Sequence, residues 1–144
     1  MKNALIFLGL LFIVLGSCKK TENEQEAIDA YLAESEFSYT MIQEGLYYVQ
    51  HVKGKGESPT VDATVRVDYT GSYIDGTEFD SRFGDYPINE WVEGLRIGIP
   101  MMKYGGKSTF IMHSDLGYGR SGRASIPGNT PLVFEVELFD FSLN

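Results

Sequence analysis

The sequence predicts an α+β domain in which an antiparallel sheet of about five strands wraps across one short helix. Most of the chain after residue 45 alternates apolar and polar residues with a period of two, which is typical of half-buried strands. One segment, residues 91–102, instead carries apolar residues at the spacing of a helix face. A length of 144 residues, 43% of them apolar, suits a single domain of this kind.

The strands are predicted from this alternation and from the turn signals between them. The expected strands span residues 46–52, 61–70, 107–113 and 132–139. Between the second and third of these, the dipeptide Asp75-Gly76 predicts a tight hairpin, because two-residue hairpin turns need positive φ angles. The hairpin adds a further strand after the turn.

The segment 91–102 contains the helix that is expected to lie across the sheet. Leu95, Ile99 and Met102 occupy positions i, i+4 and i+7, which places them on one face of a helix. Pro100 and a Gly-Gly pair beyond it mark the end of the helix, because proline and glycine disfavour its continuation.

Residues 1–17 are expected to be a secretory signal peptide. One positive charge precedes a run of twelve residues, 4–15, that are all apolar or glycine. This run is shorter than the roughly 20 residues that a membrane-spanning helix needs. The Leu-Gly-Ser-Cys segment ending at Cys18 resembles the lipobox of bacterial lipoproteins, in which the cysteine is lipidated and becomes the N-terminus. An ordinary signal peptide with a coincidental cysteine is the alternative.

The lipobox resemblance implies an exported protein, anchored to a bacterial membrane through a lipid on Cys18, with its domain in the periplasm or at the cell surface. Because Lys19 rather than an aspartate follows the cysteine, analogy with that family favours the outer membrane.

Residues 18–44 are expected to form a lipid-anchored acidic tether, and residues 45–144 the folded domain. Ile28, Tyr31 and Leu32 recur at helical spacing and predict a short helix near residues 24–35. We expect this segment to be solvated and to hold the domain away from the membrane. A helix that binds a specific partner is the alternative.

Composition excludes several classes of function. With 12 Lys and Arg against 20 Asp and Glu, the net charge is −8, so no nucleic-acid partner is expected. One cysteine cannot form an intramolecular disulfide, and Cys18 with His51 and His113 is not the ligand pattern of a zinc site. We recognise neither a nucleophile with its base nor a phosphate-binding loop. We therefore expect no metal and no cofactor.

Five motifs follow one another along the chain: Val67-Asp68-Tyr69-Thr70-Gly71; Asp75-Gly76 with Phe79-Asp80-Ser81; Val92-Glu93-Gly94-Leu95; Leu116-Gly117-Tyr118-Gly119 with Ile126-Pro127; and Leu132-Val133-Phe134-Glu135-Val136-Glu137-Leu138. In their order and spacing, the chain from Leu46 to Phe141 resembles the FKBP-type peptidyl-prolyl cis-trans isomerases. The acidic N-terminal helix and lipid anchor are similar to the membrane-attached isomerase lipoproteins of gliding bacteria. The resemblance implies an FKBP-like fold with an apolar pocket that isomerises Xaa-Pro bonds.

The resemblance also implies a set of site residues. Those expected to be catalytic are Tyr69, Phe79, Asp80 and Tyr118, and those expected to bind substrate are Val92, Leu95, Ile126, Phe134, Trp91 and Tyr86. The Asp80 carboxylate is expected to accept a hydrogen bond from the Tyr69 hydroxyl at the pocket rim. The Tyr118 hydroxyl and the Val92 N–H are expected to hold the carbonyls of a bound proline segment.

Three departures from the family pattern carry expectations of their own. Leu95 is expected at the pocket floor, where the family usually has tryptophan, and the smaller floor weakens the expected binding of macrolide inhibitors. The short stretch between residues 81 and 87 predicts a missing rim aromatic, for which Phe83 is the candidate replacement. Arg120 and Arg123 add local positive charge that favours acidic residues beside the proline of a substrate.

The expected function is therefore peptidyl-prolyl isomerisation that assists the folding of exported or envelope proteins. Proline-containing polypeptides are the expected substrates, and a monomer is the expected state. One alternative is a catalytically weak module that binds proline segments, or a chaperone scaffold at the envelope. Another is a lipid-tethered structural component of an envelope machine that uses its acidic segment as the contact.

Overall fold

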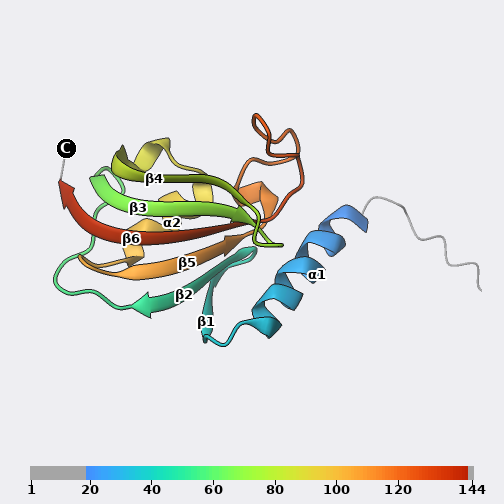
Figure 1. The fold of residues 1–144 in the computed structure, drawn as a ribbon, viewed down its shortest axis with the longest axis horizontal. Coiled ribbons are helices and arrows are strands. Elements are labelled where there is room, and N and C mark those ends of the chain that lie inside the picture. Colours follow the sequence, from blue (N-terminus) through green and yellow to red (C-terminus); the bar gives the residue numbers. More distant parts are fainter. Residues whose placement is uncertain (1–18, 143–144) are drawn as a thin grey trace, which may run out of the picture.

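The computed structural model describes residues 19–142 and shows one curved sheet with helices packed against it (Figure 1). The predicted signal peptide and Cys18 lie outside the described residues. In chain order the helices and strands are α1 (Lys19–Glu34), β1 (Tyr39–Gln43), β2 (Leu46–Val52), β3 (Thr64–Tyr73), β4 (Glu78–Pro87), α2 (Glu93–Gly98), β5 (Lys107–Met112) and β6 (Leu132–Ser142). Three short 3-10 turns complete them: η1 (Ile88–Glu90), η2 (Ile99–Met101) and η3 (Ser114–Leu116).

The six strands form one antiparallel sheet in the order β1-β2-β5-β6-β3-β4. The predicted α+β class with an antiparallel sheet is confirmed, and β2 has the bounds expected from the sequence. Strand β1 was not predicted. It is an edge strand whose residues are exposed or half-buried, with Tyr39 and Met41 largely exposed, so its apolar residues do not alternate in the way that marks a core strand.

The predicted hairpin joins β3 to β4. Gly76 has a φ of +87°, which glycine adopts without strain, and its N–H donates to the Tyr73 carbonyl at 2.9 Å. The Asp75 side chain accepts a hydrogen bond from the Thr77 N–H at 2.9 Å and closes the turn. The turn therefore sets the register that places Tyr69 and Asp80 on neighbouring strands.

The helix predicted within 91–102 is divided into α2 and the turn η2, and it covers the inner face of the sheet. Leu95 and Ile99 are fully buried there and pack in one apolar cluster with Phe110 and the inner side chains of β3 and β6. Gly98 permits this close approach, because a Cβ at that position would collide with the Phe110 ring. The helix is held against the strands that carry the site.

Helix α1 packs on the opposite face of the sheet, which corrects the expectation of a solvated tether. Ile28 is fully buried and Leu32 is 4% exposed. They form a second apolar cluster with Tyr47, Val49, Ile111 and Val133, the outward-facing side chains of β2, β5 and β6. The strands are apolar on both faces at this end of the sheet, so burying the outer apolar area stabilises the docked helix by on the order of 2 kcal/mol for each large side chain.

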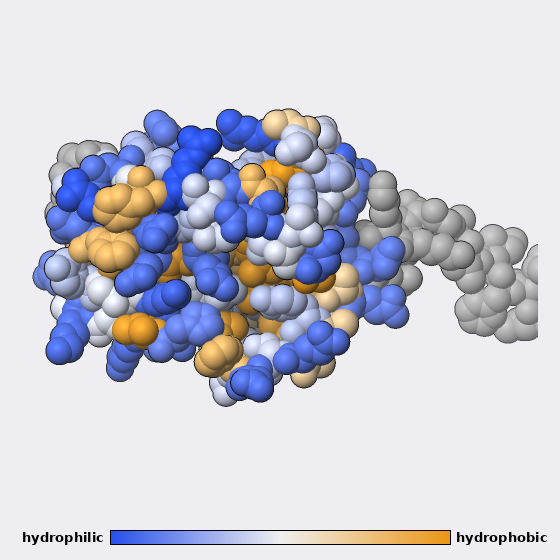
Figure 2. All heavy atoms as spheres, in the orientation of Figure 1, coloured by the Kyte–Doolittle hydropathy of each residue, from blue (hydrophilic) through white to orange (hydrophobic). Residues whose placement is uncertain are grey.

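The rest of the surface seen in this orientation is mainly hydrophilic, and its apolar side chains gather in small, separate patches (Figure 2). One exposed apolar pair is Phe83 on β4 with Phe139 on β6, whose rings meet edge to face at 5.5 Å. Among residues 19–142, no helix is both long enough and apolar enough to cross a membrane.

Candidate active site

A cavity of about 440 Å³ lies where β3, β4, the segment before α2 and the loop after η3 meet. Nine of the ten residues expected at the site line it: Tyr69, Phe79, Asp80, Tyr86, Trp91, Val92, Tyr118, Ile126 and Phe134. The tenth, Leu95, does not. The structure therefore brings together residues that are spread over 66 positions of the sequence, from 69 to 134.

The rim of the cavity contains a hydrogen-bonded pair from the β3–β4 hairpin. The Tyr69 hydroxyl donates to Asp80 Oδ2 at 2.6 Å, as the family resemblance implies. Arg82 Nε donates to Asp80 Oδ1 at 3.1 Å. Burial alone would raise the pKa of Asp80, but the hydrogen bonds from Tyr69 and Arg82 outweigh it and leave that pKa below its ordinary value. Asp80 is therefore a carboxylate at neutral pH.

Tyr69 is correspondingly held as a neutral donor. Burial and the hydrogen bond to the Asp80 carboxylate both raise the pKa of its phenol. The hydroxyl proton is donated to Asp80, so the hydrogen bond holds the Tyr69 and Asp80 side chains in place at the rim of the cavity.

Three aromatic rings form one wall of the cavity. Trp91 meets Tyr69 edge to face at 4.8 Å and meets Tyr86 at 5.3 Å, while Tyr69 and Tyr86 meet at 5.7 Å. Such edge-to-face pairs are each worth about 0.5–1.5 kcal/mol beyond the burial of area, so the three rings hold one another in place. The wall is therefore aromatic.

Phe79 and Phe134 form the opposite part of the lining, with ring centroids 5.7 Å apart. Both rings approach the backbone of β3 at Gly71. A Cβ at Gly71 would lie 2.7 Å from the Phe79 ring and 2.9 Å from the Phe134 ring, so this position requires glycine. The glycine of the Tyr69-Thr70-Gly71 motif therefore has a steric role in the pocket.

Trp91 occupies the lining, and Leu95 does not, which corrects the floor assignment. Helix α2 starts only at Glu93, so Trp91 precedes it in extended backbone. Leu95 lies in the first turn of the helix and is fully buried in the core. The expectation that Leu95 forms the cavity floor is wrong, and the large aromatic side chain of Trp91 contributes to the lining instead.

Tyr118 reaches the cavity from the loop that follows η3. It is half-buried, and burial raises the pKa of its phenol, so the hydroxyl is protonated at neutral pH. Within residues 19–142, no protein group shares a hydrogen bond with this hydroxyl. The Arg123 guanidinium lies 5.9 Å from the centre of the same ring. Tyr118 thus lines the cavity with a protonated hydroxyl that is available as a donor.

Val92 lies at the N-terminus of α2 and also faces the cavity. Its carbonyl accepts hydrogen bonds from Leu95 and Arg96, both at 3.0 Å. Its N–H precedes the helix, and no described residue accepts a hydrogen bond from it. Val92 therefore lines the cavity with an N–H that has no acceptor among the described residues, and its role as a donor to substrate stays a prediction.

Two further outcomes concern charged and aromatic residues near the rim. Phe83 points away from the cavity toward Phe139, because it alternates with Arg82 along β4, so it does not replace a rim aromatic. Arg82 and Glu90 line the cavity and were not predicted. The signal for Arg82 was present, because residues i and i+2 of a strand share a face and Asp80 was already placed there.

The sequence pattern of the FKBP-type peptidyl-prolyl cis-trans isomerase family matches residues 55–139, and the chain belongs to this family. It is 40% identical over 101 residues to the FKBP-type peptidyl-prolyl cis-trans isomerase FkpA of Aeromonas hydrophila, and 41% identical over 105 residues to that of Escherichia coli K12. Each alignment covers 67% of this chain. They cover 38% and 37% of those relatives, so the chain spans less than two fifths of their length.

Solved structures agree with this assignment. The crystal structure of FkpA from E. coli superposes with a TM-score of 0.77 at 32% identity, over 87% of this chain and 62% of that one. A peptidyl-prolyl cis-trans isomerase from Pseudomonas syringae pv. tomato superposes with a TM-score of 0.78 at 26% identity, over 86% of this chain and 94% of that one. The described residues contain no group of three or more His, Cys, Asp or Glu side chains placed to hold a metal ion.

Proposed function

We propose that this protein catalyses cis–trans isomerisation of Xaa-Pro bonds in exported or envelope proteins and thereby assists their folding. The observation that carries the proposal is a cavity with aromatic walls, lined by Tyr118, whose hydroxyl has no hydrogen-bond partner among residues 19–142. Family membership supports the reaction type. The proposal needs no proton transfer and no covalent intermediate, since only a rotation has to be accelerated.

The barrier to that rotation comes from amide resonance and amounts to roughly 18–20 kcal/mol. The two isomers of an Xaa-Pro bond are nearly balanced, yet they exchange in roughly 10–100 s without a catalyst. A planar amide is more polar than a twisted one, because twisting removes the resonance. A cavity lined by Trp91, Phe79 and Phe134 therefore disfavours the planar ground state relative to the twisted transition state.

The two donors at the cavity complete the mechanism. The Tyr118 hydroxyl and the Val92 N–H would hold carbonyls of the substrate while the bond rotates. A ten-thousandfold acceleration needs about 5.5 kcal/mol, at about 1.36 kcal/mol for each factor of ten. Desolvation together with one or two hydrogen bonds is of that order.

The cellular setting forms part of the same proposal. Export and anchoring by a lipid on Cys18 are supported by the composition of residues 1–17 and by the lipobox resemblance. Folded as a monomer at the outer membrane, the domain would meet proline-containing chains as they arrive from export.

The experiment is a proline-isomerisation assay on the purified protein, with Tyr118→Phe and Phe79→Ala beside the wild type. We expect Tyr118→Phe to lower turnover with little change in Tm. Phe79→Ala should lower both, because its ring also packs on Phe134. Phe83→Ala, which removes a ring from the same strand outside the cavity, is the matched control.

The outcomes separate an enzyme from a binding module. Acceleration that falls in both site variants, and not in Phe83→Ala, supports catalysis in this cavity. A folded wild type that binds a proline peptide without accelerating its isomerisation would instead assign the fold to binding. An equal, large fall in Tm for both site variants would contradict the separate roles of Tyr118 and Phe79.

A further inference from the structure

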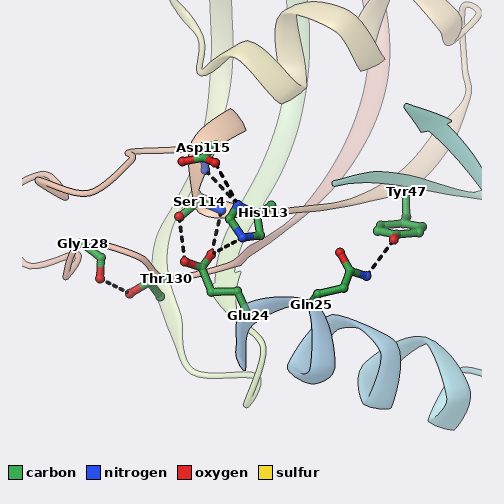
Figure 3. Close-up of polar contacts among 8 residues, drawn as sticks. All are labelled: Glu24, Gln25, Tyr47, His113, Ser114, Asp115, Gly128 and Thr130. Carbon is green, nitrogen blue, oxygen red and sulfur yellow. Dashed lines mark hydrogen bonds and ion pairs between the residues drawn. The ribbon is translucent and has the colours of Figure 1, made fainter. Parts of the chain in front are cut away.

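The side chain of Glu24 in α1 is buried against the start of the loop that carries Tyr118 (Figure 3). Glu24 Oε2 accepts a hydrogen bond from the Ser114 backbone N–H at 3.0 Å, and Oε1 accepts one from the Ser114 hydroxyl at 3.0 Å. Glu24 is 6% exposed and Ser114 is 1% exposed, so water does not replace either partner. The contact joins residues that are 90 positions apart.

His113 completes the surroundings of this carboxylate. Its Nδ1 accepts a hydrogen bond from the Asp115 backbone N–H at 3.3 Å, which places the proton of the neutral ring on Nε2. Nε2 lies 3.4 Å from Glu24 Oε2. The buried Glu24 side chain thus accepts two hydrogen bonds from Ser114 and lies beside His113 Nε2, which has no hydrogen-bond partner among the described residues. Removing it would leave the donors of Ser114 buried without an acceptor.

Ser114 in turn fixes the backbone on both sides of Tyr118. Its carbonyl accepts hydrogen bonds from the Gly117 N–H at 2.9 Å and from the Gly119 N–H at 2.8 Å. These two donors flank Tyr118 in the sequence. A displacement of Ser114 therefore displaces the segment from which the Tyr118 ring enters the cavity.

We propose that Glu24 is a positioning residue for Tyr118, so that docking of the N-terminal helix sets the geometry of the isomerase site. The proposal rests on the proposed function. Glu24 does not line the cavity and does not reach the substrate, and it acts through Ser114 and the two glycine N–H groups. Because coupling between two sites is reciprocal, a proline peptide in the cavity would also favour the docked helix.

The neighbouring residue Gln25 supplies a matched control. Its Nε2 donates to the Tyr47 hydroxyl on β2 at 2.8 Å, so Gln25 also ties α1 to the sheet (Figure 3). Its hydrogen bonds within the described residues go to Asp29 and Tyr47, so unlike Glu24 it forms none with the loop. Gln25→Ala therefore removes one contact between α1 and the sheet while the helix stays docked through Glu24 and its apolar side chains, whereas Glu24→Ala releases Ser114.

The test compares Glu24→Ala, Glu24→Gln and Gln25→Ala in the full chain. We expect Glu24→Ala to lower kcat by about tenfold to a hundredfold, the scale of a misplaced catalytic group. Glu24→Gln should fall between it and the wild type, because an amide keeps one acceptor for Ser114. Gln25→Ala should keep the wild-type kcat. In a Tyr118→Phe background, Glu24→Ala should change kcat by less than about twofold, because the group it positions is already absent.

A second measurement does not depend on turnover. Amide hydrogen exchange at Gly117 and Gly119 should be faster in Glu24→Ala than in the wild type or Gln25→Ala, by about tenfold or more. If Glu24→Ala does not fold, Ser114→Ala removes only the hydroxyl contact and keeps the backbone one. It should show the same two effects at smaller size.

The outcomes distinguish this inference from the proposed function. An inactive wild type would overturn the proposed function, whereas faster exchange at the two glycines in Glu24→Ala would still support the coupling. Equal kcat in Glu24→Ala and Gln25→Ala, or effects of Glu24→Ala and Tyr118→Phe that simply add, would overturn the positioning role. Unchanged exchange at both glycines would overturn it as well.

Discussion

The Tyr69 hydroxyl donates to the Asp80 carboxylate across 2.6 Å, and Arg82 contacts the other oxygen of the same carboxylate at 3.1 Å. The pair joins adjacent strands at the rim of the cavity. Because these partners leave the pKa of Asp80 below its ordinary value, the charged form is favoured in the folded state. Asp80 therefore stabilises the fold above about pH 4, and this contribution is lost as the pH falls through its folded pKa.

Asp80→Asn should accordingly show a shallower loss of unfolding free energy below about pH 4 than the wild type. Asp85→Asn is the control. Arg66 bonds Asp85 on the exposed face of β4 and lowers the pKa of that carboxyl too, so the same flattening is expected. Only Asp80→Asn should also weaken binding of a proline peptide, because Asp85 lies outside the cavity. Denaturant titrations from pH 3 to 7 and a peptide Kd at pH 7 would test this, and equal peptide binding by both variants would contradict it.

Trp91 and Leu95 should respond differently to substitution, although they lie four residues apart. Leu95→Ala is expected to cost about 2–5 kcal/mol of unfolding free energy, because it empties a fully buried site. Trp91→Leu should raise the Kd of a proline peptide by about tenfold, since one aromatic contact is worth on the order of 1.4 kcal/mol. Trp91 is the only tryptophan, so its fluorescence in the wild type should report peptide binding directly. Emission that does not change at saturating peptide would argue against its place in the site.

The same two residues show where sequence reasoning reaches its limit. Helical spacing identified Leu95 as apolar and inward-facing, and the structure agrees. Periodicity does not reveal where the helix begins, and a start at Glu93 leaves Trp91 in the extended segment that borders the cavity. The family resemblance located nine of the fourteen residues that line the cavity. Alternation along a strand accounts only for those on β3, β4 and β6, where it decides which side chains share a face.

The helical spacing of Ile28, Tyr31 and Leu32 predicted the N-terminal helix. It did not predict that this helix packs on the sheet. The sequence of β2 could have indicated this packing, because Tyr47 and Val49 are apolar on one face of the strand while Leu46 and Tyr48 are apolar on the other. A strand that is apolar on both faces needs cover on both. The bond between Glu24 and Ser114 had no such signal, since nothing in a sequence pattern pairs residues so far apart.

Ile28→Ala tests whether α1 is part of the folded unit. Because Ile28 is fully buried, we expect a loss of about 2–5 kcal/mol of unfolding free energy. Glu26→Ala, one exposed position on the same helix, should stay within about 0.5 kcal/mol of the wild type. Thermal or urea unfolding of the wild type, Ile28→Ala and Glu26→Ala would measure these differences in unfolding free energy. Matching stabilities for Ile28→Ala and Glu26→Ala would restore the solvated tether that the structure contradicts.

Arg123 gives the last prediction, which concerns substrate choice. Its guanidinium lies over the Tyr118 ring at 5.9 Å and lines the cavity, whereas Arg120 in the same loop does not. We expect the wild type to isomerise peptides with glutamate beside proline faster than those with lysine.

The expected preference is about 1.4- to fivefold, because an exposed charge pair is worth roughly 0.2–1 kcal/mol. Arg123→Gln should abolish it and Arg120→Gln should leave it intact. Since the pair is solvent-exposed, the preference should also shrink as salt rises toward about 1 M, where the screening length falls to about 3 Å. The test is to measure isomerisation rates of the glutamate and lysine peptides with the wild type, Arg123→Gln and Arg120→Gln, each at low and high salt. A preference that survives in Arg123→Gln would place its origin elsewhere on the rim, with Arg82 as the next cation to substitute.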